Sequence, residues 1–212
     1  LEHSDLRIIE ATSLLPNYFD ANSTDFLKRE SGHELWAENH IPGSVFAGIL
    51  EELSDTDDGR FMYGIPAAEK FSDVMSRLGI ADGTAVIIYD RAMNMWAARL
   101  WWMLRTFGFD NAAVLNGGYT KWLAERKPVS ADKHVHAPAQ FHPRFRPDLI
   151  ASREDVLAAT RADDICLINA LDPDEFAGRP PHRYARPGHI PSSVNIPFAK
   201  TADPDSQLLS LI

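Results

Sequence analysis

A succession of strand, loop and helix in residues 82–129 constrains the fold of this 212-residue chain more than any other feature. Ala85–Tyr89 is a continuous apolar run rich in β-branched residues, which is typical of a strand buried on both faces of a parallel sheet. A short loop, residues 90–94, leads into residues 95–107, which are too many for a buried strand and carry apolar side chains at helical spacing. The pattern therefore predicts a strand that feeds a helix.

A second strand and a second helix follow in residues 112–115 and 119–125, separated by the turn Asn116-Gly117-Gly118. Together the elements make one and a half βαβ units, which indicates an α/β fold. Ligands of such sheets bind at the carboxyl ends of the strands, where the loop 90–94 lies. Most loops of this kind bind nothing, so on these residues alone the loop is interpreted as an ordinary connection.

Charge and composition exclude several classes of partner. The formal net charge of −9 argues against nucleic acid and against an anionic membrane surface, although a locally positive pocket could still bind a small anion. No apolar stretch is long enough to span a membrane, and the first residues lack the pattern of a signal peptide. One cysteine rules out an internal disulfide, so we expect a cytoplasmic protein. The histidines show no metal-ligand spacing, and we expect no metal and no cofactor.

Further elements flank this central stretch. Residues 6–11 predict a short strand, and residues 66–78 predict a helix with proline in its first turn. Residues 127–150 are rich in proline and histidine and have no period, which favours an extended linker. Ser152 followed by Asp155 resembles a capping box at a helix start, and residues 165–170 predict another strand.

Two segments of the first half recur, in order, in the second half. Residues 8–11 (IIEA) resemble residues 167–170 (LINA), and residues 40–45 (HIPGSV) resemble residues 189–194 (HIPSSV). Two ordered matches at nearly equal separations indicate an internal repeat. We therefore expect a complete α/β domain in residues 1–126, a linker in residues 127–150, and the opening part of a second copy in residues 151–212.

The sequence also resembles a known family. HIPGSVF, LNGGYTKWLAERKPV and RPGHIPSSVNIPF are similar to segments of the tandem-domain rhodaneses, the thiosulfate and 3-mercaptopyruvate sulfurtransferases, and YDRAMNMWAARLWWMLRTFGF is close to the pattern of their first domain. The resemblance covers nearly the whole chain. It implies rhodanese-like domains with a mainly parallel sheet and helices on both faces, the second domain being incomplete in this chain.

The resemblance also implies a reaction. In that family a cysteine of the second domain, at the end of the central strand, takes a sulfur atom from the donor as a persulfide and passes it to an acceptor. Loop N–H groups and a helix N-terminus stabilise the sulfur anion there. Asp90 occupies the corresponding position of the first domain, so this loop has no nucleophile, and the catalytic cysteine is expected beyond residue 212.

The expected function is therefore sulfurtransferase activity. The implied partners are a small anionic sulfur donor, thiosulfate or 3-mercaptopyruvate, and a thiol or cyanide acceptor. The alternative is a catalytically silent rhodanese-homology protein with a binding or regulatory role. A cysteine at the end of the second central strand distinguishes the two.

Three residues resemble catalytic groups but are interpreted as structural. Cys166 lies inside a predicted apolar strand with no glycine-bearing loop after it, so it is expected to be a small buried core residue. His40 and His189 recur before Ile-Pro in the repeat, which favours a structural role in the turn over that of a catalytic base.

The helix after the Asp90 loop carries four further candidates. By resemblance, Met95 and Trp96 wall the active-site cleft and contact substrate, and ordinary core packing is an equal alternative. Arg99 and Arg105 lie on an otherwise apolar helix. A buried arginine needs partners, and for each of them an ion pair within the domain is favoured over substrate binding.

The second copy departs from the family pattern. Asn169-Ala170-Leu171 stands where the family has Asp-x-Arg, and Glu175 stands where an arginine often binds the anionic donor. Glu175, with Arg179 and Arg186, is a candidate for substrate binding, since the nearby arginines, Arg183 among them, could replace the missing charge. A solvated loop is the alternative for these arginines.

Overall fold

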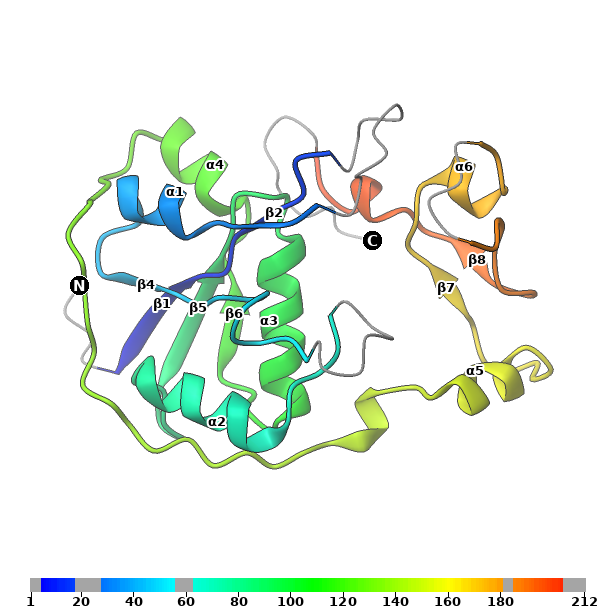
Figure 1. Cartoon of the computed structure of the whole chain (residues 1–212), viewed down its shortest axis with the longest axis horizontal. Helices are drawn as coiled ribbons and strands as arrows, with labels where there is room; N and C mark the ends of the chain where they lie inside the picture. Colours follow the sequence, from blue (N-terminus) through cyan, green and yellow to red (C-terminus); the bar gives the residue numbers. More distant parts are fainter. Residues whose placement is uncertain (1–4, 18–27, 56–62, 181–184, 204–212) are drawn as a thin grey trace.

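The computed structural model describes residues 5–17, 28–55, 63–180 and 185–203. Residues 5–126, here called the first unit, contain a four-stranded sheet, and residues 151–203, the second unit, contain a separate two-stranded sheet. Residues 127–150 run around the first unit before they reach the second (Figure 1). Within the described residues no helix is long and apolar enough to cross a membrane.

The sheet of the first unit is parallel, with the order β4-β1-β5-β6. Its strands are β1 (Leu6–Glu10), β4 (Ser44–Phe46), β5 (Ala85–Tyr89) and β6 (Ala112–Val114). The sequence patterns predicted β1, β5 and β6 to within a residue or two. A short antiparallel pair, β2 (Ser13–Leu14) with β3 (Glu30–Ser31), was not predicted.

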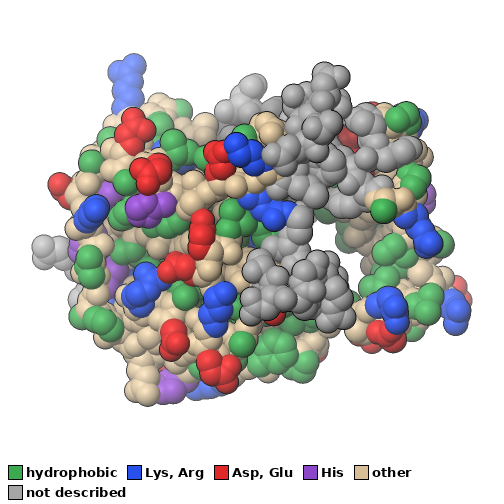
Figure 2. All heavy atoms as spheres, in the orientation of Figure 1, with side chains coloured by type: hydrophobic (Ala, Val, Ile, Leu, Met, Phe, Trp, Pro, Cys, Tyr) green, Lys and Arg blue, Asp and Glu red, His purple; other side chains and the backbone are tan. Residues whose placement is uncertain are grey.

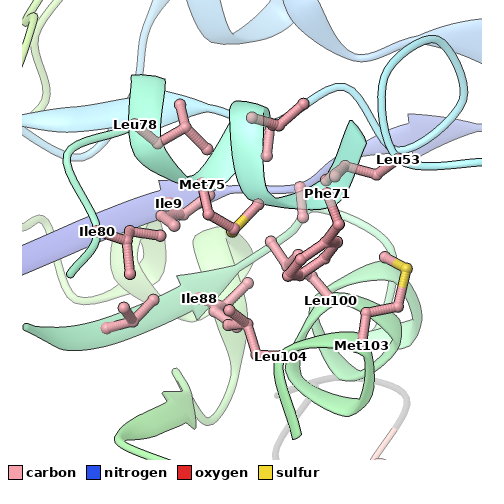
Figure 3. Packing of buried hydrophobic residues seen from close by; sticks show 14 of the residues in the cluster. Ile9, Leu53, Phe71, Met75, Leu78, Ile80, Ile88, Leu100, Met103 and Leu104 are labelled. Atoms are coloured by element: carbon pink, nitrogen blue, oxygen red, sulfur yellow. The ribbon is translucent and has the colours of Figure 1, made fainter. Parts of the chain in front are cut away.

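Helices cover both faces of this sheet. They are α1 (His33–Glu38), α2 (Ala68–Arg77), α3 (Met95–Thr106) and α4 (Gly118–Ala124). On one face, side chains of α2 and α3 converge with Ile9 and Ile88 in the main core (Figure 3). On the other face, Tyr89 packs with Ile41 and with Tyr119 of α4 in a smaller cluster. Because neighbouring strand residues point to opposite faces, β1 and β5 contribute side chains to both clusters.

The linker is attached to the first unit along its length. The backbones of Ser130 and His40 exchange two hydrogen bonds, and the Phe141 side chain is buried in the main core. Arg146 makes a bidentate pair with Asp110, with both N–O distances at 2.7 Å. The extended linker is therefore packed against the first unit, as expected.

The linker ends with η1 (Pro147–Leu149). The second unit begins with α5 (Arg153–Ala159), and the predicted capping box between Ser152 and Asp155 is present. The remaining elements are β7 (Ile168–Asn169), α6 (Pro173–Phe176), β8 (Val194–Asn195) and η2 (Phe198–Lys200). The prediction of a buried strand over residues 165–170 is wrong, because β7 is shorter and is paired only with β8 among the described residues. Ile168 is 60% exposed. Figure 2 shows hydrophobic side chains over the surface of this unit.

The pairing of β7 with β8 repeats that of β1 with β4. In the first unit Ile9 lies opposite Val45 in a parallel register. In the second unit Ile168 lies opposite Val194, also in parallel. These are the residues that the sequence repeat aligns, so the two halves share local geometry as well as sequence.

Candidate functional site

The loop after β5 folds around the side chain of Asp90. The strand ends at Tyr89, and α3 begins at Met95. Between them the backbone turns so that its N–H groups face the carboxylate. One carboxylate oxygen accepts hydrogen bonds from Ala92 (2.7 Å) and Asn94 (2.9 Å), and the other accepts from Trp96 and Ala97 (both 2.8 Å). We call these four N–H groups the amide cradle.

The cradle is buried, and the positive ends of its four N–H dipoles point to one carboxylate. Asp90 is fully buried. Met93 and Asn94 have positive φ angles of 55° and 64°, which turn successive N–H groups inward at the start of α3. Burial raises the pKa of Asp90, and the four amide hydrogen bonds oppose that rise. Such a site, at the carboxyl end of a central strand, is suited to holding a small anionic group.

A buried ion pair fixes the same loop from its other side. Arg91 contacts Glu10, at the end of β1, with an Nε–Oε1 distance of 2.6 Å, and Glu10 is fully buried. Arg91 also donates to the carbonyl oxygen of Asn39 and lies 3.9 Å from the centre of the Tyr119 ring. Sequence reasoning missed this network. A charged residue directly after the apolar pair Ile8-Ile9 at the end of β1 was the available signal.

His40 and His189 have the same kind of contacts, although His40 is buried and His189 is exposed. One ring nitrogen of His40 lies 2.7 Å from the carbonyl oxygen of Trp36, and the two rings stack at 4.6 Å. In the second unit, His189 is 2.7 Å from the carbonyl oxygen of Phe176 and stacks on that ring at 3.7 Å. This geometry agrees with the structural interpretation of both histidines.

The predicted residues of α3 separate into different environments. Trp96 is only 4% exposed and belongs to the main core, while Met95 is partly buried against that core. Arg105 pairs with Asp110 at 3.9 Å, as expected. The ion pair expected for Arg99 is wrong: its Nη2 donates to the carbonyl oxygen of Tyr63 at 2.6 Å, and no carboxylate pairs with it in the described part of the chain.

The candidates of the second unit do not form one site with the cradle. Cys166 is exposed, so the prediction that it is a buried core residue is wrong, because no further strand covers this part of the second unit in the described structure. Arg179 forms an ion pair with Asp174 at 2.7 Å, so its charge is already balanced by that carboxylate. Glu175 is partly buried, Arg186 is exposed, and Arg183 lies outside the described residues.

A cavity of about 590 Å³ lies away from the cradle. Its wall includes Phe46 of β4, Arg77 of α2, and His134 and His136 of the linker. Among the residues that the structure describes, no group of histidine, cysteine and acidic side chains is arranged to hold a metal ion.

Comparison with known proteins identifies the fold family. The Rhodanese-like domain family matches residues 15–125. The rat 3-mercaptopyruvate sulfurtransferase is 34% identical over 199 residues, which are 92% of this chain and 63% of that protein. A putative thiosulfate sulfurtransferase of Mycolicibacterium smegmatis is 30% identical, over 96% of this chain and 74% of that protein.

A solved structure agrees with these matches. The 3-mercaptopyruvate sulfurtransferase SseA of Escherichia coli superposes with a TM-score of 0.79 at 27% identity, covering 95% of this chain and 72% of that chain. The present chain spans 63% of the length of the chicken thiosulfate sulfurtransferase, to which it is 30% identical. The fold, the position of the Asp90 loop and these matches lead to one conclusion: the chain belongs to the rhodanese family.

Proposed function

We propose that these residues are part of a sulfurtransferase that moves sulfane sulfur from thiosulfate or 3-mercaptopyruvate to a thiophilic acceptor. The observation that carries the proposal is the amide cradle at the end of β5. Its four N–H groups, from Ala92 to Ala97, bind a buried anion at the position where the resemblance places a persulfide in the catalytic copy. The names of the relatives support the same reaction class.

The proposed domain organisation follows from the repeat. Residues 1–126 form the non-catalytic copy, residues 127–150 link the copies, and residues 151–212 open the second copy. The matching register of β1 with β4 and of β7 with β8 supports this division. We infer that the nucleophilic cysteine belongs to a segment that follows residue 212 in a longer protein, in a loop equivalent to that of Asp90.

In the proposed reaction, the cysteine thiolate attacks the outer sulfur of the donor. With thiosulfate, the S–S bond of the donor breaks, sulfite leaves with the electron pair, and the protein keeps a persulfide. An acceptor such as cyanide then attacks the outer sulfur, so that thiocyanate forms and the thiolate is regenerated. N–H groups of the second cradle stabilise the negative charge on sulfur at both stages.

The substrate-binding candidates remain predictions. Met95 is partly exposed beside the cradle and is proposed to wall the cleft, whereas Trp96 contributes from within the core. Glu175, Arg179 and Arg186 are proposed to face the donor in the complete second copy.

The test uses the longer protein. Incubation with cyanide and either thiosulfate or 3-mercaptopyruvate should form thiocyanate, and replacement of the aligned second-copy cysteine by serine should abolish it. Failure with both donors would contradict the proposal and favour the catalytically silent alternative. A second copy without a cysteine at the end of its central strand would likewise contradict the proposal and favour the silent alternative.

A further inference from the structure

Among the described residues the guanidinium group of Arg99 has no acidic partner, although it is largely removed from water. Burial lowers the pKa of Arg99. Its Nη2 donates to the carbonyl oxygens of Tyr63 and Gly64, whereas its Nε–H is buried and has no acceptor among the described residues. A buried cation without a counter-ion is costly, and an unsatisfied buried donor calls for an explanation.

A second cation lies on the same aromatic ring. The guanidinium carbon of Arg29 is 5.0 Å from the centre of the Tyr63 ring, and that of Arg99 is 5.5 Å from it. Both charges oppose the rise that burial causes in the pKa of the Tyr63 hydroxyl. Arg29 makes a further interaction of its own, so the charge near this ring that has no acidic partner among the described residues is that of Arg99, which favours an anion nearby.

Trp96 adds another donor to this group. Its ring lies 5.2 Å from that of Tyr63, and its side chain is only 4% exposed. The indole Nε1–H is buried and has no acceptor in the described part of the chain. Trp96 and Arg99 are three residues apart on α3, so they lie on the same face of the helix, and both are close to the Tyr63 ring.

We propose that Arg29, Tyr63, Trp96 and Arg99 form a binding site for a small oxyanion on the first unit, here called the Tyr63 cluster. The ligand class is a carboxylate or a sulfur oxyanion, groups that accept hydrogen bonds from guanidinium and indole donors. Tyr63 and Arg99 are partly exposed at the surface of the first unit, and the Nε of Arg99 and the indole Nε1 of Trp96 are buried beneath it.

The site adjoins the amide cradle of the non-catalytic copy without belonging to it. The backbone N–H of Trp96 holds Asp90, while the indole of the same residue faces Tyr63. If the proposed function is correct, the Tyr63 cluster would bind the anionic sulfur donor, thiosulfate through its oxygen atoms or 3-mercaptopyruvate through its carboxylate. This assignment of the ligand rests on the proposed function, whereas anion binding itself does not.

Calorimetric titration of the 212-residue protein with thiosulfate and, separately, with 3-mercaptopyruvate tests the site, with chloride at equal ionic strength as the blank. We expect saturable binding of at least one of them, and the stronger ligand identifies the oxyanion preferred. Arg99→Gln and Trp96→Phe should each weaken that binding at least about tenfold, because each removes a donor to a charged acceptor. The matched control is Arg105→Gln on the same helix, whose partner is Asp110, and it should bind like the parent.

A purely structural role for Arg99 gives a different result. If Arg99 only braces the backbone of residues 63 and 64, Arg99→Gln lowers the melting temperature but leaves anion affinity unchanged in the folded fraction. That outcome, or the absence of binding to the parent chain, would overturn the proposal. Should Arg99→Gln fail to fold, Trp96→Phe decides, because it keeps an aromatic ring in the core and removes the indole N–H. None of these measurements needs turnover, so they can fail while the longer protein still forms thiocyanate.

Discussion

Replacing Asp90 by asparagine tests the amide cradle directly. The substitution keeps the shape of the side chain but turns one acceptor oxygen into an NH₂ group. Each carboxylate oxygen now serves two backbone N–H groups, so two of the four would lose their acceptor and face another donor. An unsatisfied buried N–H costs about 1–3 kcal/mol, which gives a loss of about 2–6 kcal/mol in the free energy of unfolding. That is a large part of the roughly 5–15 kcal/mol typical of a domain.

Urea denaturation followed by tryptophan fluorescence is the appropriate assay. All five tryptophans, at positions 36, 96, 101, 102 and 122, lie in the first unit, so the signal reports that unit alone. Asp73→Asn is the matched control, since this aspartate is exposed on α2 and its replacement should change stability by no more than about 0.5 kcal/mol. A loss for Asp90→Asn no larger than that of the control would refute the reasoning that the cradle depends on two acceptor oxygens.

Three further predictions follow from other parts of the molecule. The 212-residue chain incubated with thiosulfate should show no sulfur adduct of about 32 Da by intact mass. Cys166 is exposed, but it is not followed by a loop whose backbone N–H groups face the sulfur atom. A stoichiometric adduct would contradict this prediction. Glu10→Gln should destabilise the first unit by about 3–5 kcal/mol in urea, because it leaves the guanidinium of Arg91 without its buried partner; unchanged stability would show that the pair is dispensable. Burial and the nearby charges of Arg7 and His134 lower the pKa of His136 to about 4 from 6.5. Folding therefore favours the neutral ring, and stability is lost as the pH falls from 6.5 toward 4. His136→Asn should flatten the pH profile of stability in that range, and a profile identical to the parent's would show that another group is responsible.

The sequence predicted the elements whose signals are local. β5 and α3 were found because an uninterrupted apolar run and a long helical period are each unambiguous over their lengths, and glycine marks the helix end. The expectation for Cys166 failed for a different reason. An apolar run indicates a strand that can be buried, but burial also needs a neighbour on each edge, and β7 is paired with β8 alone in the described structure.

Partners distant in sequence could not be predicted. Glu10 and Arg91 are brought together only because β1 and β5 are adjacent in the sheet. For Arg99, the helical pattern correctly indicated burial beside the core but could not identify what its guanidinium contacts. The cradle was anticipated as a loop at the carboxyl end of a strand, yet its four hydrogen bonds depend on the backbone angles of Met93 and Asn94.

The attachment of the linker limits how far the second unit can move. Arg146 is held to the first unit by Asp110 and by a backbone hydrogen bond to Thr106, and α5 begins just after Ser152. The chain between these points, residues 147–151, spans at most roughly 18 Å when fully extended. A tether this short gives the two units a high effective concentration with respect to each other. Weak complementary contacts between them, too weak to join separate molecules, would then suffice to keep the second unit against the first.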